Sequence, residues 1–340
     1  MKTLVCQSPG QFEYRDQEIP TIANDHALIR IRRIGICGTD LHAFEGTQPY
    51  FNYPRVLGHE LSGEIVDIRG AGSNLFTEGE LVCVLPYFSC GSCVACRTGK
   101  TNCCVHMQVA GVHCDGGMAE YFAVPTSMLI EGRGLDADAL ALVEPFSIGL
   151  HAIQRSTIRA GEFVLVIGAG PIGIGVMLFA KLAGAHVIAM DVNHHRLQRA
   201  TKIAGLSHAI HVTNSIDAIQ SIRDITGTDL PTLLIDATGN QQAINNGLQY
   251  VAHGGRYVLV GLQKGDLIFN HPDFHRKEMS LMSSRNATRR DFESVIQCMI
   301  KGEIDLPTYI THRIGFDQLK MDFPSLLDPQ NVVLKALVEF

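Results

Sequence analysis

The sequence predicts a two-part fold, in which a mostly β N-terminal half is followed by a doubly wound α/β region with a parallel sheet. In the first 150 residues, short runs rich in Val, Ile and Leu alternate with turns that contain Gly or Pro, as strands do. From Gly161 onward, strand-like runs alternate with helical segments, which indicates βαβ units. A glycine-rich turn directly after the first strand of this region supports the same interpretation.

The elements can be placed in order along the chain. Strands are expected over residues 26–34, 63–68 and 80–85 of the N-terminal half. The continuous apolar run 163–167 is typical of a strand buried on both faces. The following elements are a helix over 172–182, a strand over 186–190, a helix from 194, a strand over 208–212, a helix over 216–225, a strand over 232–236, a helix from 241, a strand over 255–260, a helix over 291–300 and a final strand over 332–340. This final strand is a candidate partner for the N-terminal domain.

Composition excludes several classes of protein. The 340 residues correspond to about two domains, and the 46% of apolar residues argues against disorder. A formal net charge of −6 without any Lys/Arg block argues against a nucleic-acid partner. No apolar run approaches the roughly 18 residues of a membrane span, and the N-terminus lacks the apolar core of a signal peptide. We therefore expect a cytoplasmic protein without a membrane or nucleic-acid partner.

Ten cysteines in a chain of this kind point to metal ligands rather than disulfides. Four of them follow the spacing C-x2-C-x2-C-x7-C, namely Cys90, Cys93, Cys96 and Cys104. Four thiolates satisfy tetrahedral zinc and leave no open coordination position, so this site is expected to be structural. Cys103 is an alternative fourth ligand, although the seven-residue spacing favours Cys104.

A dinucleotide-binding turn is predicted at residues 168–173, between a strand and a helix. Its first glycine makes the turn, its second lets the backbone approach a pyrophosphate, and its third allows close packing of helix and strand. An acidic residue stands at the end of the next strand, 18 residues after the turn, where a carboxylate binds the ribose hydroxyls of NAD. A nearby arginine leaves NADP open. The predicted cofactor-binding residues are Gly168, Gly170, Pro171, Ile172, Gly173, Asp191 and Arg196.

Potential ligands of a second, open metal site are Cys37, the pair His59-Glu60, and Glu144. Each is a weak indication by itself, because a lone Cys is usually a small buried hydrophobe. They indicate an open metal site only in combination with a nucleotide-binding fold and a separate structural zinc site.

Over essentially its whole length the chain resembles the zinc-dependent medium-chain alcohol dehydrogenases. The resemblance rests on residues 35–40, 58–60, 115–121 and 144–145, together with the four-cysteine segment and the glycine turn. Glu144 stands where other alcohol dehydrogenases have a Cys, which is similar to the sorbitol, threonine and sugar-acid dehydrogenase branch. Residues 53–57, 102–104 and 284–288 are similar to bacterial dehydrogenases that act on L-galactonate or L-gulonate.

The resemblance implies a domain organisation and a metal content. Residues 1–148 would form a GroES-like catalytic domain with a structural-zinc lobe at about 88–106, residues 149–285 a Rossmann NAD-binding domain, and residues 286–340 a return to the catalytic domain. It implies two Zn²⁺ per chain, the catalytic one bound by Cys37 and His59. The third ligand is either Glu60 or Glu144, or the two exchange as substrate arrives. Asp40 or Glu120 could orient these ligands.

The family's mechanism implies roles for further residues. Zinc lowers the pKa of the substrate hydroxyl, whose proton leaves through the Thr39 hydroxyl, the nicotinamide ribose and then His42, while a hydride passes to NAD. Arg285 is the expected substrate-selecting residue, because a guanidinium fork suits a carboxylate or several hydroxyls. Tyr50 and Phe51 are expected in the outer wall of the pocket.

The predicted function is oxidation of a secondary hydroxyl on a polyol or sugar acid, L-galactonate or L-gulonate-like, by an NAD-dependent homodimer or homotetramer. One alternative is a dehydrogenase for L-threonine or another small secondary alcohol. A second is a quinone or enone reductase without catalytic zinc, and a third is a non-enzymatic nucleotide-sensing protein on the same scaffold.

Overall fold

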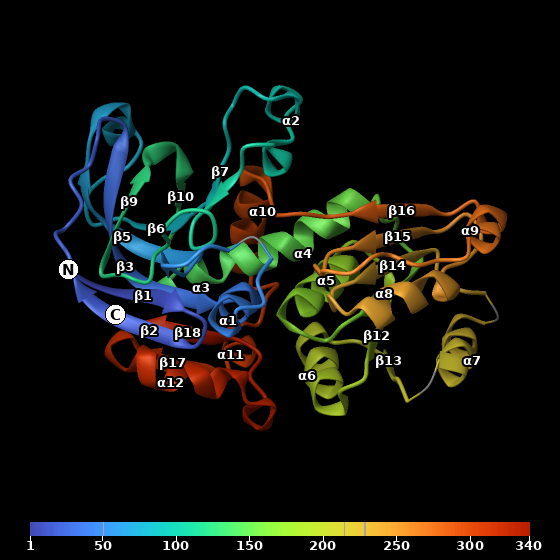
Figure 1. Cartoon of the computed structure of the whole chain (residues 1–340). Helices are drawn as coiled ribbons and strands as arrows, with labels where there is room; N and C mark the ends of the chain where they lie inside the picture. Colours follow the sequence, from blue (N-terminus) through green and yellow to red (C-terminus); the bar gives the residue numbers. More distant parts are fainter. Residues whose placement is uncertain (50, 214, 228) are drawn as a thin grey trace. The chain divides into compact units, whose positions relative to one another are not determined.

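A computed structural model of the chain describes residues 1–49, 51–213, 215–227 and 229–340, and these form two compact units (Figure 1). Unit 1 contains Met1–Pro145 and Ala287–Phe340, and unit 2 contains Phe146–Asn286. The domain boundaries expected after residues 148 and 285 lie within three residues of these limits. Tyr50, expected in a pocket wall, lies outside the described residues.

Unit 1 is built on a seven-stranded sheet with the order β10-β6-β5-β3-β18-β17, in which β9 also pairs with β3. Its strands are β3 (His26–Ile36), β5 (Glu60–Ile68), β6 (Leu81–Val84), β9 (Tyr121–Pro125), β10 (Leu129–Glu131), β17 (His312–Gly315) and β18 (Ala336–Glu339). A smaller sheet joins β1 (Lys2–Ser8), β2 (Gln11–Asp16) and β4 (Arg55–Val56), and β7 (Tyr87–Phe88) pairs with β8 (Gln108–Val109). The long strand β3 therefore connects most of the unit, and it ends at Ile36, directly before Cys37.

The C-terminal segment completes the sheet of unit 1. Strand β18 pairs antiparallel with β3, with Ala336 opposite Ile36. It is shorter than the predicted strand over 332–340, because residues 329–331 form a 3₁₀ turn and Val332 adopts a left-handed backbone with φ of 45°. The expected partnership between the final strand and the N-terminal half is confirmed.

Unit 2 contains a six-stranded sheet that is parallel throughout, with the order β13-β12-β11-β14-β15-β16 (Figure 1). Its strands are β11 (Phe163–Ile167), β12 (His186–Asp191), β13 (His208–His211), β14 (Leu233–Asp236), β15 (Arg256–Leu259) and β16 (Ser280–Ser283). The helices are α5 (Pro171–Leu182), α6 (His194–Ala204), α7 (Ser215–Thr226), α8 (Gln241–Gly247) and α9 (His271–Lys277). The prediction of a doubly wound parallel sheet is confirmed, but β16 and α9 were missed. The sequence Ser-Leu-Met-Ser of β16 has no β-branched or aromatic residue, so it gives a weak strand signal.

The remaining helices are α1 (Gly38–Glu45), α2 (Val94–Arg97), α3 (Ala137–Ala141), α4 (Val143–Ser156), α10 (Arg289–Ile300), α11 (Leu306–Tyr309) and α12 (Leu319–Asp322). Helix α1 begins where Asp40 accepts the backbone N–H of Cys37 at 2.9 Å, and it ends at Gly46 in the left-handed region. Among the described residues, no helix combines the length and apolar character that a membrane crossing requires.

Candidate active site and metal centres

The four predicted cysteine ligands come together in the segment between β7 and β8, which projects around α2 in Figure 1. The Sγ atoms of Cys90, Cys93, Cys96 and Cys104, called here the thiol cluster, all lie within 4.8 Å of one another. Backbone N–H groups of Cys90 and His106 donate to the Cys104 sulfur at 3.2 and 3.3 Å. Cys103 is exposed and does not belong to the cluster. Four converging thiols suit a closed tetrahedral zinc site.

The thiols of the cluster differ in proton affinity, since the pKa of Cys93 is lowered while desolvation raises the pKa of Cys96 to about 11. Hydrogen bonds from the Ser92 side chain and backbone, and from the Cys93 backbone, lower the pKa of the Cys90 thiol to about 5. Because the thiolate is the form that binds metal, these donors favour the metal-binding form of Cys90.

A second set of candidate ligands is formed by Cys37, His59 and Glu60, called here the mixed cluster, whose ligand atoms lie within 4.8 Å of one another. Cys37 follows β3, while His59 and Glu60 stand at the start of β5, so the antiparallel pairing of β3 with β5 brings them together. Gly35 of β3 lies directly opposite Glu60, and a Cβ atom there would lie 1.8 Å from the Glu60 Oε2 atom. Only glycine leaves room for this carboxylate.

The histidine of the mixed cluster shows how well the set suits a metal ion. The Nδ1 atom of His59 is buried and has no hydrogen-bond partner among the described residues, although Asp40 Oδ1 lies 3.8 Å away. Burial lowers the pKa of His59, but the negative charges of Asp40 and Cys37 outweigh this effect and raise it well above the ordinary value. A thiol, an imidazole and a carboxylate, all directed to one point inside the protein, are the donors that zinc binds.

Asp40 has the position expected of a residue that orients the cluster. It is fully buried, and besides the N–H of Cys37 it accepts the N–H of Gly58 at 3.2 Å. It thus ties together the two chain segments that supply the ligands. Glu120, the other candidate for this role, instead accepts the backbone N–H of Lys2 at 2.7 Å.

Lys335 is a charged neighbour of the mixed cluster that the sequence did not reveal. Its Nζ atom lies 2.7 Å from both carboxylate oxygens of Glu60 and 3.0 Å from the carbonyl oxygen of Ile36, and the residue is only 2% exposed. The lysine comes just before β18, so the C-terminal segment of unit 1 places an ammonium group next to the mixed cluster. A single Lys inside the otherwise apolar run 332–338 was the signal that could have found it.

Glu144 lies near the start of α4 and is buried, but it is not one of the three converging ligands. The buried hydroxyl of Tyr87 donates a hydrogen bond to its Oε1 atom. Burial raises the pKa of Glu144 to about 7, against the lowering effect of His59 and with a further raising effect from Glu60. The structure therefore places two differently held carboxylates here, since Glu60 pairs with a lysine and Glu144 with a tyrosine.

The predicted proton relay residues both lie on α1. Thr39 and His42 are three residues apart in the helix, which puts them on the same face. The His42 side chain is 61% exposed, with its Nδ1 atom 3.1 Å from the Thr47 hydroxyl and 3.4 Å from a Glu45 carboxylate oxygen. Thr39 is half-buried and lies closer to Cys37 along the helix.

The predicted dinucleotide turn joins β11 to α5, with Pro171 at the first helical position. A Cβ atom at Gly173 would lie 1.8 Å from the Gly168 carbonyl oxygen, so the third glycine is required for close packing. At Gly170 a Cβ atom would meet nothing within 4 Å, which leaves the space that a pyrophosphate needs. The residues present therefore fit a dinucleotide.

Asp191 ends β12 beside this turn. One of its carboxylate oxygens accepts the N–H of Ala169 at 2.6 Å, and the other accepts the N–H of Asn193 at 2.7 Å. The carboxylate is thereby fixed next to the glycine turn and remains partly exposed. Arg196, in the first turn of α6, is exposed.

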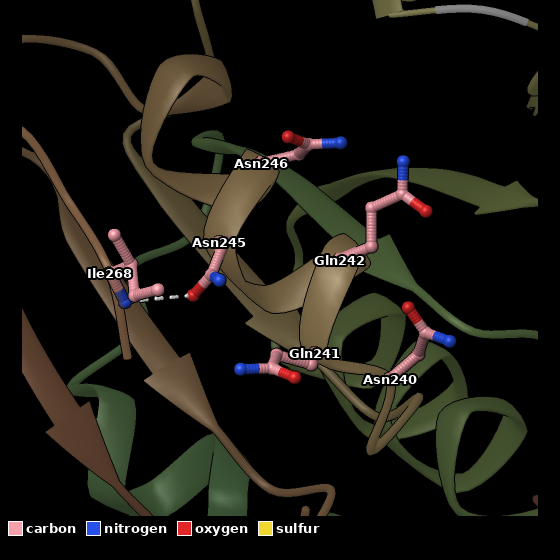
Figure 2. Close-up of a pocket in the computed structure, with 6 residues that line it drawn as sticks. All are labelled: Asn240, Gln241, Gln242, Asn245, Asn246 and Ile268. Atoms are coloured by element: carbon pink, nitrogen blue, oxygen red, sulfur yellow. Dashed lines mark hydrogen bonds between the residues drawn. The ribbon is translucent and has the colours of Figure 1, made fainter. Parts of the chain in front are cut away.

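The expected substrate residues belong to different units. Arg285 follows β16 in unit 2 and is exposed, whereas Phe51 packs its ring against Tyr53 in unit 1 at 4.7 Å between centroids. Figure 2 shows a different hollow on unit 2, around α8, where Asn245 accepts the N–H of Ile268 at 3.1 Å. Its lining consists of Asn240, Gln241, Gln242, Asn245, Asn246 and Ile268. None of these six residues is titratable, so we assign it no part in the chemistry.

Two family models match the chain in regions that agree with this geometry. The alcohol dehydrogenase GroES-like domain matches residues 23–133, and the zinc-binding dehydrogenase model matches residues 171–301. Together they cover both candidate metal clusters and the last three residues of the glycine turn. The chain belongs to the zinc-type alcohol dehydrogenase family. The predicted family, fold class and dehydrogenase activity are thereby confirmed.

Full-length relatives within the alcohol dehydrogenase family agree with this membership. The chain is 43% identical to L-galactonate-5-dehydrogenase of Escherichia coli K12, over 100% of this chain and 99% of that protein. It is 30% identical to sorbitol dehydrogenase of Bacillus subtilis, over 99% and 97% of the two chains. A crystal structure of an alcohol dehydrogenase, rspB, from Escherichia coli CFT073 in complex with NADH superposes with a TM-score of 0.91 at 32% identity, covering 100% of this chain and 99% of that one.

Proposed function

We propose that this dehydrogenase oxidises a secondary hydroxyl of a sugar acid of the L-galactonate or L-gulonate type, with NAD as the hydride acceptor. The observation that supports the proposal most directly is the mixed cluster, where three donors converge and the buried His59 Nδ1 atom has no partner. The 43% identity to L-galactonate-5-dehydrogenase over the full length supports the substrate class.

The two clusters support a content of two zinc ions per chain. The thiol cluster would hold a structural zinc with four protein ligands, and the mixed cluster would hold a catalytic zinc with Cys37, His59 and Glu60. Three protein ligands leave one coordination position open for substrate. When bound, zinc polarises the substrate hydroxyl as a Lewis acid, and NAD accepts the hydride.

The chain's own residues hold this arrangement and move the proton. Asp40 fixes the segments that carry Cys37 and His59, and Lys335 holds the Glu60 carboxylate. The Thr39 hydroxyl receives the proton that the substrate hydroxyl loses, and His42 passes it to solvent, because the His42 side chain is 61% exposed. Arg285 would bind the carboxylate of the sugar acid through its guanidinium fork. A homodimer or homotetramer in the cytoplasm completes the proposal.

The decisive experiment is an NAD-reduction screen with hexonates, pentonates, polyols and L-threonine, with the metal content measured on the same sample. We expect the highest kcat/KM with a hexonate and about two zinc ions per chain. A preference for L-threonine or for a polyol would overturn the substrate class. A chain that binds a single zinc and reduces quinones or enones would overturn the mechanism as well.

The choice of cofactor has its own test. Replacing Asp191 removes the carboxylate expected on the ribose hydroxyls, so Asp191→Ala should weaken NAD binding about tenfold, or about 1.4 kcal/mol, with NADP binding less affected. Isothermal titration calorimetry with both nucleotides measures the difference. Unchanged NAD affinity would refute the role given to Asp191.

A further inference from the structure

Glu144 is held by a residue whose side chain is itself fixed. Tyr87, in the short strand β7, is 5% exposed, and its hydroxyl donates to Glu144 Oε1. The ring packs edge-on against Phe292 of α10, with 6.2 Å between the centroids. A buried, packed phenol has few alternative positions, so the direction of its O–H group is set by the fold.

The carboxylates of Glu60 and Glu144, both near Cys37 and His59, have different partners. Glu60 lies within 4.8 Å of the other two ligand atoms, although it is also paired with Lys335. Glu144 is equally buried but lies outside this set, and one of its oxygens is engaged by the tyrosine. A carboxylate can offer two oxygens to a metal ion, so a strong donor on one of them limits how the group can turn.

We propose that Tyr87 is a positioning residue that keeps the Glu144 carboxylate out of the ligand set of Cys37, His59 and Glu60. This inference rests on the proposed function, since it assumes a metal ion at the mixed cluster. With the hydroxyl present, Glu60 is the third ligand and Glu144 stands next to the set without joining it. Without the hydroxyl, Glu144 turns toward the metal ion, becomes an additional ligand and fills the position that substrate needs.

The test replaces Tyr87 by Phe in the full-length protein and uses cobalt in place of zinc at the mixed cluster. The absorption bands of cobalt depend on the identity and arrangement of its ligands, so they report the ligand set without substrate. We expect altered bands in Tyr87→Phe and a return to the wild-type spectrum in the double variant Tyr87→Phe/Glu144→Gln. We also expect slower loss of zinc to a chelator from Tyr87→Phe, and kcat about tenfold lower with an unchanged KM for NAD.

Two further variants keep the test independent of folding defects. Glu144→Gln alone should leave the cobalt spectrum unchanged, because Glu144 is not a ligand in the wild type. Tyr257→Phe is the matched control, since Tyr257 is also fully buried and donates to a backbone oxygen, that of Ile244, at 3.0 Å in unit 2. It should lose the same hydroxyl without any spectral change.

Either of two results would overturn the positioning role: a Tyr87→Phe spectrum identical to wild type, or a changed spectrum in Glu144→Gln alone. If cobalt fails to bind at Cys37 even in the wild type, the proposed function fails, and the inference fails with it. A failure of the inference alone therefore looks different from a failure of the function.

Discussion

The two candidate metal centres of this dehydrogenase are assembled in opposite ways. The thiol cluster takes four donors from 15 consecutive residues, in a segment where Cys90 is exposed and only Cys104 is fully buried. The mixed cluster takes its three donors from the adjoining ends of two paired strands, β3 and β5, and its charged partner Lys335 lies 275 residues away from Glu60 in the sequence. The first centre depends on local sequence, and the second depends on the completed sheet.

The difference follows from what each centre must do. A closed thiolate site needs only to saturate its ion, and short loops with close ligand spacing achieve this. An open site must keep a coordination position free inside the protein, where unpaired charges are costly. Lys335 offsets this cost by pairing with the Glu60 carboxylate, and Asp40 offsets it by hydrogen-bonding the segments that carry the ligands. The contrast suggests four measurements.

The largest effect is expected from Cys37→Ala, which breaks the mixed cluster and leaves the thiol cluster intact. Because a Lewis acid contributes several kcal/mol to such a reaction, turnover should fall roughly 10⁴-fold. One metal ion per chain should be lost, while NAD binding is retained. Steady-state kinetics and elemental analysis measure both quantities. Cys298→Ala, which changes a cysteine outside both clusters, is the control, and normal turnover in Cys37→Ala would contradict the assignment.

The next largest effect should come from Lys335→Met, which leaves the Glu60 carboxylate buried without its cation. We expect the free energy of unfolding of metal-free protein to fall by about 3–5 kcal/mol, as for other broken buried pairs. Urea denaturation measures the loss. The double variant Lys335→Met/Glu60→Gln removes both charges and should recover part of the stability. Equal losses in the single and double variants would mean that the ion pair is not the cause.

Cys96→Ser should act locally, in contrast to both variants of the mixed cluster. Loss of one thiolate should release one metal ion and raise the rate of proteolysis within residues 88–106 about tenfold, equivalent to about 1.4 kcal/mol of local opening. Cys103→Ser changes the neighbouring cysteine outside the cluster and should alter neither quantity. Uniform destabilisation of unit 1 by Cys96→Ser would show that the two centres are less independent than their geometry indicates.

The smallest effect concerns a more exposed ion pair near the same sheet. Burial alone would raise the pKa of Asp138, but hydrogen bonds from Arg313 and Arg33 outweigh it and hold the pKa below its ordinary value. A lowered carboxyl pKa stabilises the folded state above about pH 4, and this contribution is lost as the pH falls through the lowered value. Since the Asp138 side chain is 22% exposed, Asp138→Asn should cost only about 0.5–1 kcal/mol at pH 7.

Acid titration of unfolding tests this smallest effect. The stability difference between wild type and Asp138→Asn should shrink as the pH falls below about 4, because the wild-type carboxyl then becomes protonated as well. A loss at pH 7 as large as that of Lys335→Met would contradict the distinction between buried and partly exposed pairs.

Much of the fold was accessible from the sequence, because local patterns determine it. The apolar strand 163–167, the glycine turn and the alternation that follows predicted the parallel sheet of unit 2. Elements with weak local signals were not predicted, namely the four-residue strand β16 and the seven-residue helix α9. The length of β18 was misjudged, because a left-handed residue at Val332 interrupts an otherwise apolar run.

The candidate site likewise contains features that the local sequence predicted and features that it did not. The spacing of the four cysteines predicted that they form one site, and the structure brings those four together. For the mixed cluster, sequence and resemblance left Glu60, Glu144 or an exchange between the two as the third ligand, and the three-dimensional arrangement favours Glu60, whose ligand atom lies within 4.8 Å of the other two. Lys335 and Tyr87 were missed, because their roles depend on contacts with residues 275 and 57 positions away, which no local pattern encodes.

The long separation between Lys335 and Glu60 also orders events during synthesis. All four thiols of the thiol cluster are available once residue 104 has left the ribosome, well before unit 2 exists. The mixed cluster cannot reach its final charge balance until β18 has been made and has paired with β3. Metal loading of the reactive centre should therefore be the last step in maturation, so that incomplete chains would not carry a competent Lewis acid. Metal uptake by ribosome-stalled chains of increasing length would reveal this order as two separate steps.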